Sequence, residues 1–143
     1  MSAGAEFARI AEEIAETIRH EMERRAYLGA NELKNAELQV IRGQGGGRRY
    51  RVAGTGKFYQ ASAPGQPPAV RTGAFRNSWQ PKALVGGGTY ISQIETTLTV
   101  SGKYNLGQLL EYGTSKMAPR PHHDKILEKA EPKIVRIYSQ PYF

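Results

Sequence analysis

One long helical pattern near the start of the chain limits what this sequence can fold into. Apolar residues recur at steps of three and four up to the fortieth residue, with charged residues between them. The members of this stripe are Phe7, Ile10, Ala11, Ile14, Ile18, Met22, Ala26, Gly29, Leu33, Ala36 and Val40. The spacing survives the glycine without a slip, so the sequence predicts one helix over about residues 4–42, with Gly29 as the place where it would bend.

Such a helix is long for a chain of 143 residues. At ~1.5 Å per residue it would measure about 55 Å, which exceeds the width of one domain of this size. We therefore expect part of it to pack on something outside its own core. The alternative is two helices that break within YLGAN, residues 27–31, because a glycine in a helix interior costs about 1 kcal/mol.

Charge is divided unevenly along the chain, whose net charge is +7. Residues 1–41 hold eight acids and five bases, giving −3, whereas residues 42–143 hold five acids and fifteen bases, giving +10. This asymmetry predicts either a polyanionic partner or self-association, in which the acidic surface of one copy meets the basic surface of the next. The remaining alternative is an ordinary soluble basic protein whose charge has no specific partner.

A segment rich in glycine and proline follows the helix and predicts an extended basic arm over residues 43–73. No acid occurs between Glu37 and Glu95. Bases and aromatic residues alternate in the first part of this region, at Arg42, Arg48, Arg49, Tyr50, Arg51, Lys57, Phe58 and Tyr59. This pattern suits a segment that follows a nucleic-acid backbone and stacks on bases. It suits equally a cationic loop that docks on an acidic protein.

Residues 74–143 predict the α+β core of a single domain. Thr72 is placed to cap a short helix in which Phe75 and Trp79 point inward. After it, apolar and polar residues alternate on both sides of a glycine run, which predicts a β-hairpin whose second strand extends through Leu98 and Val100.

Two further helices complete the predicted core. The first is short and ends near Gly113, and the second begins near His122 and is interrupted by Pro132. The expected order is a long N-terminal helix (1–42), the arm (43–73), and a core (74–143) with a small antiparallel sheet, a short helix and a C-terminal helix.

Few residues suggest chemistry. The chain has no cysteine, which excludes disulfides and thiolate metal sites. His122 and His123 are adjacent and do not match the i, i+4 spacing of a helical zinc pair. The glycine runs match no phosphate-binding pattern, and no nucleophile elbow is present. No apolar run approaches the ~18–20 residues that cross a bilayer. The sequence predicts a non-enzymatic protein with no catalytic residue, no cofactor, no metal and no membrane.

Two stretches resemble one known family. Residues 61–78, ASAPGQPPAVRTGAFRNS, match the family pattern Ala-Ser-Ala-Pro-Gly-x-Pro-Pro-Ala-x-x-Thr-Gly-x-Leu-Arg-x-Ser, with Phe75 in place of leucine. Residues 111–121, EYGTSKMAPRP, match its Glu-aromatic-Gly-Thr-Ser-Lys-Met-x-Pro-Arg-Pro signature. His122 and His123 stand where the family favours Phe-Leu. The chain thus resembles the gene-product-ten-like family of tailed-phage morphogenesis proteins, which are tail-completion, neck or head–tail joining proteins similar in role to minor tail protein Z of phage lambda.

The resemblance implies a structural virion protein, assembled in the host cytoplasm, that forms a ring at the head–tail junction around the DNA channel. A hexamer is favoured and a dodecamer is the alternative. Its neighbours would be head-closure or connector proteins on one side and tail terminator or tail-tube proteins on the other. Genomic DNA would pass through with weak or no specific binding. Two other readings are a tail terminator ring protein and a DNA-binding module that uses the basic arm 42–57.

The expected interface residues lie in the arm and in the EYGTSKMAPRP stretch. They are Arg48, Arg49, Tyr50, Arg51, Pro64, Pro67, Pro68, Arg71, Glu111, Tyr112, Lys116 and Arg120. Within that stretch we expect Glu111 and Arg120 to pair across a corner between two helices. If a lone subunit is monomeric and forms its ring only on a partner, the arm should be disordered in the free protein.

Overall fold

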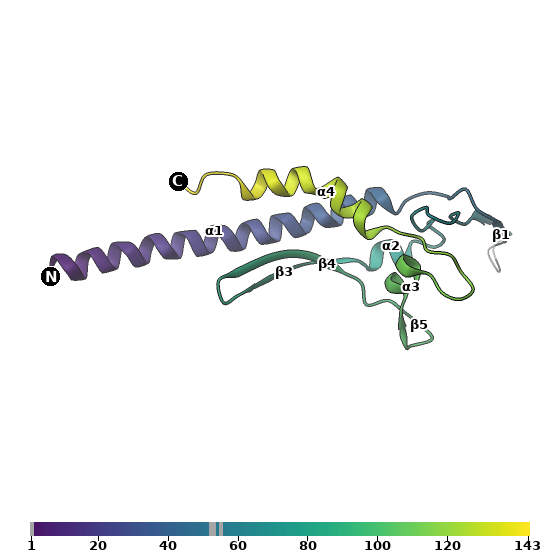
Figure 1. Cartoon of the computed structure of the whole chain (residues 1–143), viewed down its shortest axis with the longest axis horizontal. Helices are drawn as coiled ribbons and strands as arrows, with labels where there is room; N and C mark the ends of the chain where they lie inside the picture. Colours follow the sequence, from purple (N-terminus) through teal and green to yellow (C-terminus); the bar gives the residue numbers. More distant parts are fainter. Residues whose placement is uncertain (1, 52–53, 55) are drawn as a thin grey trace.

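The long helix forms as expected and dominates the molecule (Figure 1). The structure is a computed structural model that describes residues 2–51, 54 and 56–143. Helix α1 spans Ala3–Val40, 38 residues, without a break at Gly29. Ser2 caps its start, because the Ser2 hydroxyl accepts a hydrogen bond from the Ala5 N–H at 3.1 Å. At its other end, the guanidinium of Arg76 donates to the Leu38 carbonyl.

Only the second half of α1 is covered by the rest of the chain. Its buried residues begin at Arg25, and its N-terminal turns project beyond the body of the molecule (Figure 1). Helix α4 (His123–Tyr138) packs along one side of the covered half, and the hairpin of β3 (Gln80–Gly86) and β4 (Thr89–Glu95) packs along the other. The molecule is therefore an α+β fold whose core surrounds one half of a single helix.

A close approach between α1 and the hairpin occurs at Gly29. The Ser92 hydroxyl of β4 donates to the Ala26 carbonyl at 2.7 Å and lies 2.8 Å from the Tyr138 hydroxyl of α4. A Cβ at position 29 would lie only 3.0 Å from Ser92 Cβ and 3.3 Å from the Tyr138 ring. The helix therefore uses glycine here because any side chain would separate the three elements.

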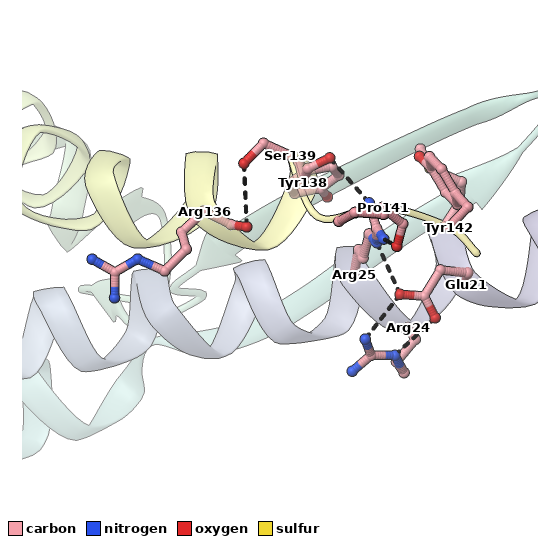
Figure 2. A network of polar contacts seen from close by, with 9 residues as sticks. Glu21, Arg24, Arg25, Arg136, Tyr138, Ser139, Pro141 and Tyr142 are labelled. Atoms are coloured by element: carbon pink, nitrogen blue, oxygen red, sulfur yellow. Dashed lines mark hydrogen bonds and ion pairs between the residues drawn. The ribbon is translucent and has the colours of Figure 1, made fainter.

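A buried arginine fastens the C-terminal end of the chain to α1 (Figure 2). Arg25 is fully buried, and its Nε donates to Glu21 at 2.9 Å. Its two terminal nitrogens donate to the carbonyls of Tyr138 and Pro141, each at 3.0 Å. The guanidinium also lies over the Tyr142 ring, 4.2 Å from the centroid. One side chain thus satisfies the last carbonyl of α4 and one carbonyl beyond the helix, and these hydrogen bonds compensate its own burial.

The strands form three separate two-stranded antiparallel sheets among the described residues. They are β1 (Arg49–Arg51) with β2 (Phe58–Gln60), β3 with β4, and β5 (Thr99–Val100) with β6 (Tyr104–Asn105). The predicted hairpin is confirmed for β3 and β4, but its second strand ends at Glu95. The extension through Leu98 and Val100 was wrong.

The early end of β4 has a local cause at Thr96. The hydroxyl of Thr96 accepts a hydrogen bond from the Leu98 N–H at 3.3 Å and lies 2.6 Å from the Ser78 hydroxyl. The Asn105 side chain donates to the Thr96 carbonyl at 2.8 Å. These side-chain bonds replace ladder bonds and turn the chain away from β3.

The core lies where α1, α4 and the segment around Trp79 meet. Its buried members are Leu33, Ala36, Ile41, Trp79, Ile126 and Ala130. Phe75, in α2 (Ala74–Ser78), packs against this cluster and contacts the Trp79 ring edge-on at 5.8 Å, as predicted. Helix α4 continues through Pro132, and α3 (Leu106–Tyr112) ends at Gly113. No helix in the described part of the chain has the length and apolarity that a bilayer crossing requires.

We predict that Gly29→Ala destabilises the fold by about 1–3 kcal/mol, because the new methyl group would push Ser92 and Tyr138 away from α1. The measurement is the urea unfolding curve followed by circular dichroism. Gly4→Ala is the matched control, since nothing lies within 4 Å of a Cβ at that position. Alanine at position 4 should be neutral or stabilising, by up to about 1 kcal/mol. Equal effects at the two positions would contradict the close-approach explanation.

Candidate functional site

The EYGTSKMAPRP stretch forms a corner between α3 and α4, and Glu111 organises it. The Glu111 carboxylate accepts hydrogen bonds from the backbone N–H groups of His122 at 2.7 Å and His123 at 3.1 Å. These N–H groups lie at the start of α4, where no helical carbonyl is available to them. Glu111 is therefore a cap supplied by one helix to the next, and its charge also suits the positive end of α4.

His122 lies beneath this cap and is fully buried. Its Nδ1 lies 2.9 Å from the Arg120 carbonyl, to which it donates as a neutral ring. Its Nε2 has no hydrogen-bond partner among the described residues. The rings of Phe75 and Trp79 lie edge-on to it, at 5.7 and 5.8 Å between centroids. This environment favours the uncharged imidazole.

The electrostatics of the corner follow from this burial. Burial lowers the pKa of His122, although the Arg120 carbonyl opposes the shift. Burial alone would raise the pKa of Glu111, but the N–H donors of His122 and His123 hold this pKa below its usual range. The contact of 3.1 Å between His122 Nδ1 and Glu111 is therefore that of a carboxylate beside a neutral ring, not of an ion pair.

The same residues form a cluster that sequence reasoning did not anticipate. One ligand atom each from Glu111, His122 and His123 lie within 4.8 Å of one another, close enough to consider a metal ion. However, the carboxylate already accepts two backbone N–H groups, and His122 Nδ1 already serves the Arg120 carbonyl. We interpret the cluster as a helix cap, because the Glu111 carboxylate and His122 Nδ1 already have partners within the fold, and His122 Nε2 alone of these atoms lacks one among the described residues.

Arg120 does not pair with Glu111, so that prediction was wrong. Its Nε donates to the Ser62 carbonyl of the arm at 3.1 Å, and another guanidinium nitrogen donates to Ala118 at 2.7 Å. Its backbone N–H donates to the Leu110 carbonyl at 2.6 Å. Glu111 is instead occupied by the start of α4. The arginine therefore joins the arm to the corner. The positions of charged residues in the sequence could not reveal this contact, because its acceptor is a backbone carbonyl.

The arm folds back onto this corner within a single chain. The Gly65 N–H donates to the Pro119 carbonyl at 3.1 Å, and Lys125 of α4 donates to the Gly65 carbonyl at 3.1 Å. Further along, the Val70 N–H donates to the Gly43 carbonyl at 2.8 Å. The described part of the arm thus makes its hydrogen bonds to the corner within its own chain.

The glycine run of the arm has a packing role. Gly45 and Gly47 donate their N–H groups to the carbonyls of Gln60 and Ala61, at 2.9 and 2.7 Å. A Cβ on either glycine would collide with the backbone of Ser62. The run therefore lies against β2 as a close backbone pairing.

The bases and aromatics of the arm pair with each other. The Tyr50 and Tyr59 rings stack at 5.6 Å between centroids. Arginine side chains lie over aromatic rings in three pairs: Arg48 over Tyr50, Arg49 over Phe58, and Arg71 over Tyr59. Beside this hairpin, an open cavity of about 530 Å³ is lined by residues of the arm, α2 and α3. The arm is thus a basic surface next to an apolar hollow.

The predicted interface residues divide into two groups. The exposed ones are Arg48, Arg49, Tyr50, Arg51, Pro64, Arg71, Tyr112 and Lys116. The others are held inside the fold: Pro68 is buried, and Pro67, Glu111 and Arg120 are partly buried in contacts with the arm and corner. This second group shapes the corner and is not available as free surface.

A surface missing from the predicted residues is the first half of α1. Four large apolar side chains of its stripe are exposed to solvent: Phe7 at 74%, Ile10 at 44%, Ile14 at 46% and Ile18 at 37%. The excess length of the helix already indicated that part of it packs outside the core. These four residues are the first large apolar members of the stripe in the sequence, so the sequence alone could have identified them.

Comparison with known proteins identified no matching family model, no matching curated protein and no matching solved structure. The function must therefore be argued from the surfaces described above.

We predict that Glu111→Ala destabilises the fold by about 1–3 kcal/mol, because it leaves two N–H groups at the start of α4 without an acceptor. Glu111→Gln keeps an acceptor oxygen and should cost less. Thermal unfolding of the purified variants measures both. An alanine variant as stable as the native chain would show that the carboxylate is not a cap.

We also predict that the native chain loses stability as pH falls below about 6.5, the usual pKa of histidine. Because burial lowers the pKa of His122, the unfolded state binds a proton there before the folded state does, and acid favours unfolding. His122→Phe should flatten the dependence of the unfolding midpoint between pH 7 and pH 5. His20→Gln is the control, since the His20 side chain is 73% exposed. An unchanged slope in the phenylalanine variant would contradict this assignment.

Proposed function

We propose that this protein is a structural subunit of a tailed-phage particle, and that it forms a ring at the head–tail junction around the DNA channel. The observation that carries this proposal is the uncovered half of α1, with Phe7 and three isoleucines exposed along it. Contiguous exposed apolar surface is typical of an interaction site. An assembly subunit would cover this surface with another protein.

The arrangement of the two signature stretches supports the same proposal. Residues 61–78 and 111–121 carry the resemblance to the phage family, and they lie against each other in the fold. The Arg120 side chain donates to the Ser62 carbonyl, and the Gly65 N–H donates to the Pro119 carbonyl, so one arginine and one backbone hydrogen bond join the two stretches. The two stretches therefore belong to one structural unit, as expected if the residues of the family pattern serve to determine the fold.

The chemistry of the corner also favours a structural role. The Glu111 carboxylate and His122 Nδ1 are used within the fold, where they cap α4 and bind the Arg120 carbonyl. A group that is fully engaged in maintaining a corner offers little to a substrate. The subunit would contribute surface and shape rather than a reaction.

A DNA-binding module is the second candidate, because the β1–β2 hairpin carries Arg48, Arg49 and Arg51 on an exposed surface. Against it, Tyr50 and Tyr59 stack on each other, and Phe58 lies beneath Arg49. The bases of DNA would have to displace these contacts before they could stack on the aromatic rings. Affinity for single-stranded DNA that falls steeply with salt would favour this second function.

The test of the neck role is a deletion of this gene in the phage that encodes it. We predict that the deletion accumulates DNA-filled heads and separate tails that fail to join, since the joining ring would be missing. Electron microscopy of the lysate counts joined and unjoined particles. Supplying the native gene from a plasmid should restore joined, infectious particles.

Mass spectrometry of purified native particles provides an independent check. The protein should remain with the particles after they have been banded on a density gradient. Its absence from intact particles, or normal joining in the deletion, would contradict the proposal.

A further inference from the structure

We propose that the acidic first half of α1 docks, head to tail, into the basic end of a second copy of this chain. On the second copy, the helix would fill the apolar hollow beside the β1–β2 hairpin. This inference rests on the proposed assembly role and names the partner of the exposed helix. It is argued from two surfaces of opposite charge at opposite ends of the molecule.

The first surface is the projecting helix. Its apolar stripe begins at Phe7, which is 74% exposed, and continues to Ile18, about 17 Å along the helix at ~1.5 Å per residue. Residues 2–24 hold six acids and three bases, giving −3. All three bases make ion pairs with acids on the same helix, so the acidic excess surrounds the stripe. Phe7 is the natural anchor, because a large exposed aromatic can fill a hollow at little entropic cost.

The second surface combines an apolar floor with a basic rim. The cavity of about 530 Å³ is lined by apolar and aromatic residues that include Tyr59, Phe75 and Leu110. Arg71 and Arg120 are also among its lining residues. Acids are absent from the sequence between Glu37 and Glu95, so the arm carries a positive net charge. An acidic amphipathic helix is complementary to this surface in both polarity and charge.

The geometry requires two copies. The start of α1 and the β1–β2 hairpin lie at opposite ends of the molecule (Figure 1). The 38-residue helix between them is continuous, about 57 Å long at ~1.5 Å per residue, and cannot fold back. One chain therefore cannot bring the two surfaces together. The contact is heterologous, which generates a ring or a filament rather than a closed dimer.

Charge argues against the simplest alternative, in which two copies pair their helices stripe to stripe. Such a dimer would bring together two segments that each carry −3, whereas the head-to-tail contact pairs the acidic segment with the basic one. Like charges that face each other across an interface are unfavourable. The isologous dimer is thus an outcome that the experiment must distinguish.

The test uses two variants that each lose one surface. Phe7→Asp with Ile14→Asp removes the helix surface. The rim variant, Arg49→Glu with Arg71→Glu, reverses one charge on the neighbouring β1–β2 hairpin and one at the cavity. All four side chains are exposed, so both variants should keep the native circular dichroism spectrum and unfolding temperature. Each variant alone should be monomeric. Mixed in equal amounts, they should form a dimer and nothing larger, because only one intact pair of surfaces remains.

Sedimentation velocity over a range of protein concentrations measures these masses. The native chain should form species larger than a dimer, and salt should weaken them, since the Debye length falls from about 10 Å at 0.1 M to about 3 Å at 1 M. Tyr27→Asp is the matched control on α1. Tyr27 is exposed, and at ~100° per residue it lies on the face opposite Phe7, so this variant should associate like the native chain.

Three results would overturn the inference. In the first, the mixture stays monomeric while the native chain associates, so other surfaces are used. In the second, the rim variant alone forms dimers, which assigns the helix to an isologous pair. In the third, the native chain stays monomeric at every concentration. Because these measurements use only the purified chain, they are separate from the deletion and particle tests, and either proposal can fail without the other.

Discussion

The close approach of α1, β4 and α4 at Gly29 is the constraint on which the rest of the fold depends. Without a side chain at this position, Ser92 reaches both the Ala26 carbonyl and the Tyr138 hydroxyl. One hydroxyl thereby holds the hairpin and the last helix against the same turn of α1. With α4 placed in this way, its first turn lies where Glu111 can cap it. The corner and the arm are thus positioned by a contact distant from both.

A second consequence is that the molecule has two ends of different character. At one end, the arm, α2 and the corner are held together by backbone hydrogen bonds and by Arg120. At the other end, the first turns of α1 are stabilised only by their own hydrogen bonds and by ion pairs such as Arg9–Glu13. Exposed pairs of this kind contribute little, roughly 0.3–0.5 kcal/mol each. A partner would therefore add most of the stability that this half of the helix can gain.

The parts of the fold that could be predicted from the sequence are those that depend on local periodicity. The apolar stripe predicted α1, and the alternation of apolar and polar residues around a glycine run predicted the β3–β4 hairpin. Both elements appear where expected. The end of β4 was missed because the Thr96 hydroxyl competes with the ladder, and a propensity pattern does not register one side-chain bond. Arg25 is one of the charged residues between the members of the stripe, yet it is fully buried and donates to carbonyls more than a hundred residues away in the sequence. At the candidate site, the corner itself was predicted, but the partner of Arg120 was missed because Ser62 is distant in sequence.

The projecting half of α1 also has a mechanical consequence. It is a stiff rod rooted at Arg25, and Phe7 lies about 27 Å from that root at ~1.5 Å per residue. A tilt of about 5° at the root would therefore move Phe7 by about 2 Å, with no change in the packing of the core. For subunits linked head to tail, such a tilt alters the rotation from one copy to the next, and this rotation sets how many copies close a ring. Small adjustments at the base of one helix would thus be amplified into the diameter of the whole assembly.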